Sequence, residues 1–436
     1  MMKTIKTFFT GLAAVCILSG IISCERVDYP DRHVIADGTP VVHYVRSTTS
    51  DALMEKGYLN DVVCLVGDNL NSVVELWFND QQATLNTSYM TDHTLIAAIP
   101  KTSPVVQTDQ IYLITPKDTV SFPFVVLLPA PVVTSMKNEY ANIGETAVIY
   151  GEYFIKVQNV KIGTTVITDF KATESSVSFT VPDGLNPDTA ISIETESGTG
   201  FASFRYMDQH GTLFDFDGKT GLGADHGWHA RVITTDDTAV SGNYVRLGDG
   251  DVELTNWNDG QFSFEYWCGS WDTPQNITKA PDIALFNLVD FSNFANMSLK
   301  FEMCIPSDNP WCDFPMQIAF QGIDQVTLSG YPVIGFDKVG GPNATIFNGD
   351  DALGTYGRAH YSPWAATGSF HTNGEWITVT IPLSKFNLDK DGKDAAFKAT
   401  KATDFGSLTM FITGASTTGT VCKPLIKIDN IRVVNN

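Results

Sequence analysis

The chain lacks the patterns that mark most metal sites and catalytic centres. Its seven cysteines never occur as Cys-x-x-Cys, and there is no His-Glu-x-x-His, no Gly-x-Ser-x-Gly and no phosphate-binding glycine loop. Acidic residues are plentiful, but no segment singles out the two carboxylates that a glycoside hydrolase places across its cleft. We therefore expect no catalytic residues and no metal centre, with a structural calcium ion left open as a possibility.

Basic residues are scarce as well. The chain has 28 Lys and Arg against 49 Asp and Glu, a formal charge of −21. Residues 1–23 contain two lysines and no acidic residue, so the remainder carries −23. Such a charge argues against nucleic acid and anionic membrane surfaces as partners and favours a neutral or cationic ligand.

Long apolar runs are confined to the N-terminus. Two lysines precede the apolar stretch 8–22, which is shorter than the roughly 20 residues that a bilayer span needs and is typical of an export signal. Ile21-Ile22-Ser23-Cys24 matches a lipobox, so we expect a lipoprotein signal peptide over residues 1–23, an acylated Cys24 and a polar tether over 24–39. The alternative is an ordinary signal peptide cut nearby, which would leave a soluble periplasmic protein.

Cysteines are too few and too scattered for a disulfide framework. Five remain after Cys16 leaves with the signal and Cys24 takes the lipid. Cys304 and Cys312 flank a turn and could bridge, but scattered cysteines more often behave as small buried hydrophobes.

Two segments, residues 40–128 and 129–206, repeat a common pattern. Val62-Val63-Cys64-Leu65-Val66-Gly67 corresponds to Thr146-Ala147-Val148-Ile149-Tyr150-Gly151, and a later apolar run in each ends in Ile-Pro or Val-Pro. Short alternating runs separated by turn residues predict a β-sandwich in each segment. The two resemble the TIG/IPT immunoglobulin-like family, which implies spacer domains without chemistry. Trp77 alternates like a core residue of a strand.

The composition of the chain changes in the segment from residue 207 to residue 436. This segment is rich in aromatic residues and glycine, shows no long amphipathic helix, and contains many alternating runs such as Met316-Gln317-Ile318-Ala319-Phe320 and Leu408-Thr409-Met410-Phe411-Ile412. We expect a two-sheet jelly roll. The predicted fold class is therefore all-β, with two Ig-like β-sandwiches followed by a larger jelly-roll β-sandwich.

Seven of the eight tryptophans lie in this last segment, several of them in polar, turn-rich sequence. An exposed ring there is suited to stack on the apolar face of a sugar, while acids and amides beside it bond to hydroxyls. Three of the tryptophans lie in strand-like sequence and are assigned to the core: Trp257, Trp267 and Trp376. The candidate glycan-binding residues are Trp271, Trp311, Tyr361, Trp364 and Trp228, with Asp272 and Asn309.

The order of parts resembles the surface glycan-binding proteins of Bacteroidota polysaccharide-utilisation systems, in particular the class whose last domain binds xyloglucan. The resemblance implies a non-catalytic lipoprotein, anchored in the outer membrane at the cell surface, that captures a polysaccharide of the β-glucan or xyloglucan class. It further implies an outer-membrane glycan importer and companion binding proteins as partners. Two alternatives stay open: a polysaccharide hydrolase or lyase with a jelly-roll catalytic domain, and a surface adhesion protein.

Overall fold

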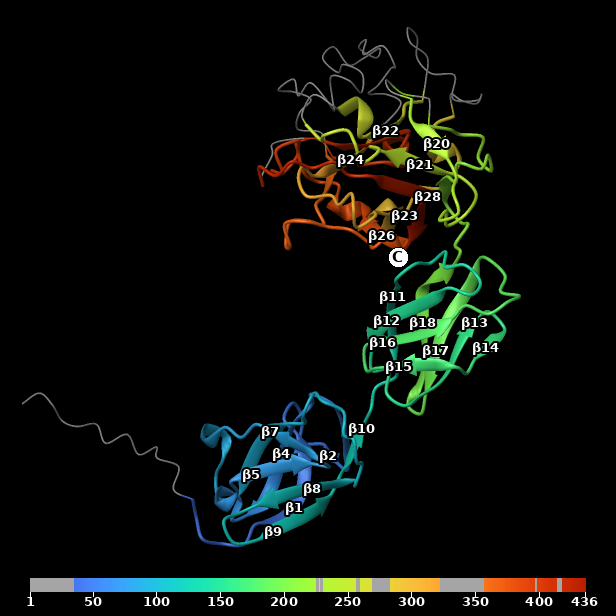
Figure 1. Cartoon of the computed structure of the whole chain (residues 1–436). Helices are drawn as coiled ribbons and strands as arrows, with labels where there is room; N and C mark the ends of the chain where they lie inside the picture. Colours follow the sequence, from blue (N-terminus) through green and yellow to red (C-terminus); the bar gives the residue numbers. More distant parts are fainter. Residues whose placement is uncertain are drawn as a thin grey trace, which may run out of the picture. The chain divides into compact units, whose positions relative to one another are not determined.

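The all-β fold is confirmed. A computed structural model describes residues 35–224, 227, 230–255, 259–268, 283–321, 357–396, 398–413 and 418–436. These residues form strands connected by loops and short 3-10 turns (Figure 1). The chain makes two compact units, one ending at Pro129 and the other beginning at Ala130. No helix among the described residues is both long and apolar enough to cross a bilayer.

The first unit is a two-sheet sandwich. One sheet has the order β2-β1-β4-β7 and the other β6-β5-β8-β9, with a parallel pair formed by β3 and β10 beside them. The strands are β1 Val41–Ser47, β2 Leu53–Met54, β3 Lys56–Tyr58, β4 Val62–Asp68, β5 Glu75–Phe78, β6 Gln81–Ala83, β7 Thr94–Ala98, β8 Gln110–Ile114, β9 Thr119–Pro123 and β10 Val125–Leu127.

Trp77 lies on a strand as predicted, but not in the core. Its neighbours Leu76 and Phe78 are buried in the sandwich, so the alternation of β5 turns Trp77 to the other face. There the indole is partly buried and its N–H donates to Glu75 at 2.8 Å.

The second unit begins with another sandwich. Its sheets have the orders β11-β12-β16-β15 and β14-β13-β17-β18. The strands are β11 Val132–Met136, β12 Thr146–Glu152, β13 Val157–Ile162, β14 Thr165–Ile167, β15 Phe170–Ala172, β16 Ser176–Thr180, β17 Thr189–Thr195 and β18 Gly198–Tyr206.

The glycines that align the two repeats occupy equivalent places. Gly67 is the penultimate residue of β4 and lies beside a bulge in β1, and Gly151 is the penultimate residue of β12 and lies beside a bulge in β11. A Cβ at Gly67 would overlap the carbonyl oxygen of Val41, and one at Gly151 would overlap that of Val132. At each bulge the backbone of the neighbouring strand comes so close that only glycine fits. This explains why both segments carry a glycine at this position of the repeat.

The rest of the second unit is a larger sandwich of two sheets. The first has the order β20-β21-β28-β23-β26, with β19 also paired to β28, and the second has the order β22-β27-β24-β25. The strands are β19 Thr212–Phe214, β20 Val232–Thr234, β21 Tyr244–Leu247, β22 Ser263–Tyr266, β23 Met297–Cys304, β24 Met316–Gln321, β25 Ala359–Tyr361, β26 Ile377–Pro382, β27 Ser407–Ile412 and β28 Ile426–Asn435. One large hydrophobic cluster fills the space between the two sheets.

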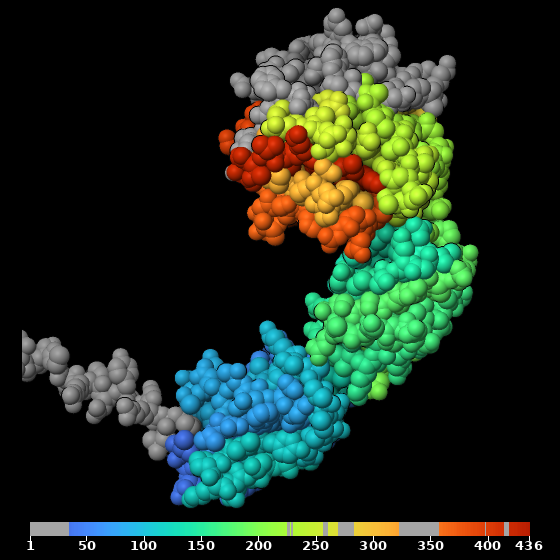
Figure 2. All heavy atoms as spheres, viewed as in Figure 1, coloured from blue at the N-terminus to red at the C-terminus, as the bar shows by residue number. Residues whose placement is uncertain are grey.

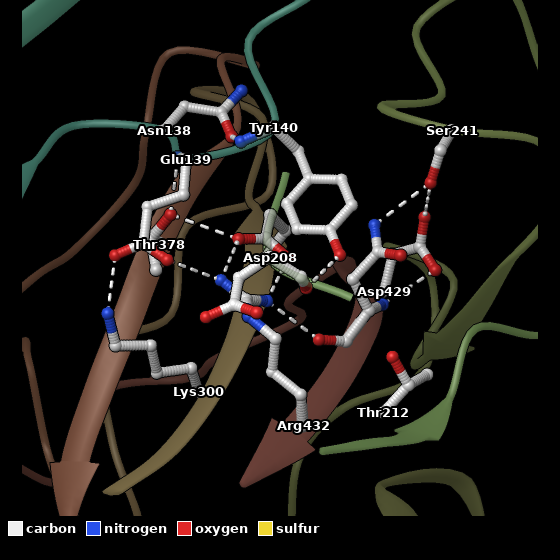
Figure 3. Close-up of polar contacts among 12 residues, drawn as sticks. Asn138, Glu139, Tyr140, Asp208, Thr212, Ser241, Lys300, Thr378, Asp429 and Arg432 are labelled. Carbon is white, nitrogen blue, oxygen red and sulfur yellow. Dashed lines mark hydrogen bonds and ion pairs between the residues drawn. The ribbon is translucent and has the colours of Figure 1, made fainter. Parts of the chain in front are cut away.

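A buried charge cluster joins the second sandwich to the jelly roll (Figure 3). Glu139, in the loop after β11, pairs with Arg432 at 2.7 Å and with Lys300 at 2.5 Å. Arg432 also makes two hydrogen bonds to Glu302, at 2.8 and 3.1 Å. All four side chains are buried, and burial raises the pKa of Glu302 against the opposing effect of Arg432. The charges compensate one another inside the junction.

Hydrogen bonds and a cation–π contact extend the same junction. The Tyr140 hydroxyl donates to the carbonyl of Asp208 at 2.6 Å, and the Arg432 guanidinium lies 4.9 Å from the centre of the Tyr140 ring. The backbone N–H of Glu139 donates to the Thr378 hydroxyl at 2.7 Å. In the space-filling view the two sandwiches meet without a gap on the face shown (Figure 2). These contacts pack the jelly roll against the second sandwich within the second compact unit.

The five cysteines in the described part of the chain are buried thiols, none in a disulfide. Cys304 packs with Tyr140, Val240 and Trp376, whereas Cys312 belongs to the main jelly-roll cluster. The bridge considered between Cys304 and Cys312 is therefore not made.

Candidate glycan-binding site

Trp311, predicted to be an exposed platform, is a core residue. Its side chain is 0% exposed. Two backbone hydrogen bonds, of 2.9 and 2.7 Å, pair it with Phe370, and the Tyr361 ring lies 6.0 Å away. The indole N–H donates to the carbonyls of Asp313 and Phe314. The prediction of exposure is wrong because residues distant in sequence cover the ring.

Trp364 and Tyr361 belong to the same interior cluster. Trp364 is 6% exposed, and its indole N–H donates to the Phe314 carbonyl at 3.2 Å. Tyr361, on β25, is partly buried against the jelly-roll core, and burial raises the pKa of its hydroxyl to about 12. The expectation that Trp364 is exposed is therefore also wrong, and these aromatic rings stabilise the fold.

Asn309 has a structural partner at each hydrogen of its amide. The group donates to the carbonyl of Gly250 at 3.1 Å and to that of Lys423 at 3.3 Å. It thereby ties two loops together, and these bonds occupy the donors that were expected to meet sugar hydroxyls.

Trp267 and Trp376 are buried, as predicted. Trp376 packs at the junction, where its ring lies 5.8 Å from that of Tyr244. Trp228, Trp257, Trp271 and Asp272 lie outside the described residues.

Trp267 leads to a feature that the sequence analysis missed. Its neighbours Tyr266 and Cys268 both point into the jelly-roll core, so Trp267 lies on the other side of the β22-β27-β24-β25 sheet. Here its indole N–H donates to the Thr409 hydroxyl at 3.0 Å. We call the buried residues on this side the polar face: Ser263, Glu265, Trp267, Gln317, Ala319, Gln321, Ser407, Thr409 and Phe411.

The strand register arranges the polar face in rows. One row runs Glu265, Thr409, Ala319, and the next runs Ser263, Phe411, Gln317. Hydroxyl, carboxylate and amide groups thus stand beside aromatic rings across three strands. Burying polar groups costs free energy unless they are hydrogen-bonded, so a face of this composition is not explained by packing alone.

The end of the polar face near β25 is closed by a loop of the protein itself. Arg358 donates to the Gln317 amide oxygen at 2.8 Å, and the Gln317 amide nitrogen donates to the carbonyl of Lys390 at 3.3 Å. Burial lowers the pKa of Arg358 to about 10 and lowers that of His360, which lies opposite Gln317. This end is a structural network.

The end near β22 is different, because two chain segments are fixed to it. Gly227 lies so close to Glu265 that a Cβ on it would overlap the Glu265 side chain. The backbone N–H of Cys268 donates to the Ser407 hydroxyl at 3.0 Å. Trp228 directly follows the first of these anchors in the sequence, and Trp271 comes three residues after the second.

One group among the described residues has metal-ligand chemistry, namely Asp188, Asp208 and His210. His210 Nδ1 lies 2.8 Å from Asp188 and 3.1 Å from Asp208, within hydrogen-bonding distance of both carboxylates. The adjoining pocket, of about 420 Å³, has no tryptophan, tyrosine or phenylalanine among the described residues that line it. It therefore does not suit stacking on a sugar.

The polar face did leave a signal in the sequence. Its strands alternate core residues with hydrophilic ones, as in Ser407-Leu408-Thr409-Met410. Alternation was used to find the strands, but a polar position on a strand is ordinarily an exposed one. Only the structure shows that these positions are buried.

Comparison with known proteins gives a separate line of evidence about the family of this chain. A family model described as the surface glycan-binding protein B xyloglucan binding domain matches residues 206–435, and a TIG domain model matches residues 39–128. The crystal structure of surface glycan-binding protein PbSGBP-B from Prevotella bryantii is 40% identical, with a TM-score of 0.76, and the match covers 92% of this chain and 99% of that one.

Two further relatives are more distant. SGBP-B from a complex xyloglucan utilization locus in Bacteroides uniformis is 15% identical over 92% of this chain and 100% of its own, with a TM-score of 0.43. An IPT/TIG domain-containing protein of Bacteroides ovatus is 25% identical over 168 residues, and this chain spans only 33% of its length. The first family model covers more than half of the chain, and the Prevotella structure is matched almost end to end. The chain therefore belongs to the surface glycan-binding protein B family, a family of non-catalytic glycan-binding proteins.

Proposed function

We propose that this protein captures a β-glucan of the xyloglucan class at the cell surface. The observation that carries this proposal is the match of the whole jelly roll to the xyloglucan-binding family model. The acidic chain suits a neutral polysaccharide, which is not repelled by its charge of −21.

The site proposed for the glycan is the β22 end of the polar face. Gly227 and Cys268 bring the chain to this end, and Trp228, Trp271 and Asp272 follow them within four residues. An indole is suited to stack on the apolar face of a sugar ring, and a carboxylate accepts hydrogen bonds from ring hydroxyls, so we assign these roles to Trp228 and Trp271 and to Asp272. The buried polar face beneath fixes the positions of both anchors.

Native gel electrophoresis in the presence of polysaccharide tests this function. Gels containing xyloglucan, mixed-linkage β-glucan, mannan or xylan are run beside a polysaccharide-free gel, with bovine serum albumin as the non-binding reference. We expect retarded migration in xyloglucan without any release of reducing ends. Unretarded migration in xyloglucan contradicts the proposal, and release of product would revive the hydrolase or lyase alternative.

We further propose that Cys24 anchors the protein in the outer membrane and that residues 24–39 tether the first sandwich. The lipobox Ile21-Ile22-Ser23-Cys24 supports this proposal. Palmitate labelling of the wild type and of Cys24→Ala tests the anchor, and protease treatment of intact cells tests outward display. Palmitate label in the Cys24→Ala variant would contradict the lipid anchor at Cys24. Full protection from protease would contradict display at the cell surface.

An outer-membrane glycan importer and the companion binding proteins of the same system are the proposed partners. Co-purification with the lipid-anchored protein from detergent-solubilised outer membranes is the test. Recovery of this chain alone, from cells grown on the bound glycan, would contradict the partnership.

A further inference from the structure

Two segments of the jelly roll that are distant in sequence lie side by side around a pair of thiols. The Leu425 N–H donates to the carbonyl of Asn309 at 3.3 Å, and the Thr418 hydroxyl donates to that of Cys312 at 3.2 Å. Between these contacts the Cys422 thiol is directed at the Pro310 carbonyl, 3.7 Å away, and the Cys312 thiol at the Val421 carbonyl, 3.8 Å away. Each sulfur is thus turned toward the opposite segment.

The two cysteines also contact each other. The backbone N–H of Cys312 donates to Cys422 Sγ at 3.0 Å. Since N and Cα are about 1.5 Å apart, the Cα of Cys312 lies within about 4.5 Å of the Cys422 sulfur. The Cα of Cys422 lies two bonds beyond its sulfur, so the separation of the two Cα atoms is of the order that a disulfide requires, about 4.4–6.8 Å.

We propose that Cys312 and Cys422 form a disulfide when the protein folds in an oxidising compartment. The thiolate of one cysteine attacks a disulfide-bearing oxidant and forms a mixed disulfide, and the second thiolate then displaces the leaving thiol. The two cysteines lose two protons and two electrons and gain one S–S bond. The oxidant, a disulfide of the glutathione or protein class, is reduced to two thiols.

The surroundings of the pair determine when the bond can form. Burial, together with the neighbouring Cys422 thiol, raises the pKa of Cys312 to about 12. Because the thiolate is the reactive species, the folded protein should exchange slowly in either direction. The bond therefore forms during folding, before residues 309–313 and 418–425 are packed, and then resists reduction.

Cys304 and Cys268 have surroundings of a different kind. Cys304 lies among Tyr140, Val240 and Trp376, and the Cys268 sulfur accepts a hydrogen bond from Ser407 at 3.3 Å. The bond would link positions 110 residues apart in the chain, and a loop of this size restricts the unfolded state strongly.

Peptide mapping tests the proposal. The protein is refolded in a buffer of reduced and oxidised glutathione, alkylated in denaturant without reductant, digested and analysed by mass spectrometry. We expect the Cys312 and Cys422 peptides to be cross-linked and the Cys304 and Cys268 peptides to be alkylated. Alkylation of both Cys312 and Cys422, or a link from either to another cysteine, overturns the proposal.

Thermal unfolding gives a second readout with matched variants. The oxidised wild type should melt about 5–10 °C above the protein refolded with dithiothreitol. Cys304→Ser should keep this difference, whereas Cys312→Ser and Cys422→Ser should each abolish it. A difference that persists in either of the last two variants contradicts the proposal, and the wild-type peptide map decides the matter if a variant fails to fold.

Discussion

Trp311 and Trp364 donate their indole N–H groups to the same backbone oxygen, the carbonyl of Phe314, at 3.1 and 3.2 Å. Phe314 has a positive φ of 57°, a conformation that L side chains rarely adopt. Two tryptophans from separate segments thus hold a strained turn in place. Aromatic residues that local composition assigns to a ligand act here on the fold.

Removing one of these rings should destabilise the protein without affecting glycan binding by the folded fraction. Trp311→Ala deletes a fully buried indole and two hydrogen-bond contacts, and we expect a loss of about 3–5 kcal/mol in the free energy of unfolding. Chemical denaturation measures the loss. A variant as stable as the wild type that no longer binds xyloglucan would return Trp311 to the binding site.

Substitutions at the proposed glycan site should weaken binding without destabilising the protein. Trp271→Ala and Trp228→Ala should each weaken xyloglucan binding about 5–10-fold, since a stacked ring contributes on the order of 1 kcal/mol. The melting temperature should stay within a degree or two of that of the wild type. Trp311→Ala is the matched control, and a fall in stability with unchanged affinity would assign either residue to the core instead.

The junction between the second sandwich and the jelly roll depends on Glu139. Glu139→Ala leaves Lys300 and Arg432 without their shared carboxylate in a buried setting, and we expect a loss of about 3–5 kcal/mol in the free energy of unfolding.

The surface offers a control for this variant. Glu375 pairs with Lys137 at 2.5 Å but is 61% exposed, so Glu375→Ala should cost less than about 1 kcal/mol. Equal effects of the two substitutions, measured by urea denaturation, would show that the buried cluster does not hold the junction.

Stability should depend on pH through Asp429. This residue of β28 accepts hydrogen bonds from Ser241 at 2.8 Å and from the backbone of Asn430 at 2.7 Å, and burial raises its pKa to about 8 (Figure 3). Between the unfolded value of 3.8 and about 8 the folded state binds more protons than the unfolded state. The free energy of unfolding therefore falls as pH rises through this window, by up to about 1.4 kcal/mol per pH unit for this one group.

Asp429→Asn removes the titrating group and keeps its shape. Urea denaturation at intervals from pH 4.5 to pH 8 should give a flatter pH dependence for the variant than for the wild type. Parallel curves would mean that Asp429 is ionised in the folded protein throughout this range.

The sequence was sufficient where structure is decided locally. Alternation located strands such as β24 and β27, and the aligned glycines Gly67 and Gly151 revealed the repeat because each marks a backbone contact that excludes a side chain. Resemblance in the order of parts then led to the family, which no single motif identified.

The sequence failed where burial depends on distant residues. The stretch around Trp311 is polar, yet the ring is covered through its pairing with Phe370, which is remote in the chain. Glu139 and Arg432 are separated by 293 residues, and nothing in either local sequence predicts their contact. The polar face was missed for the same reason, because hydrophilic positions on its strands suggested exposure.

Isothermal titration of a xyloglucan oligosaccharide into the purified full-length protein tests the central claim most directly. The account predicts saturable binding by the wild type and by Tyr89→Ala, whose exposed ring lies in the first sandwich, and little or no binding by the Trp228→Ala/Trp271→Ala double variant at unchanged melting temperature. Wild-type affinity in the double variant would contradict the proposed site, and no binding by the wild type to xyloglucan would contradict the proposed function.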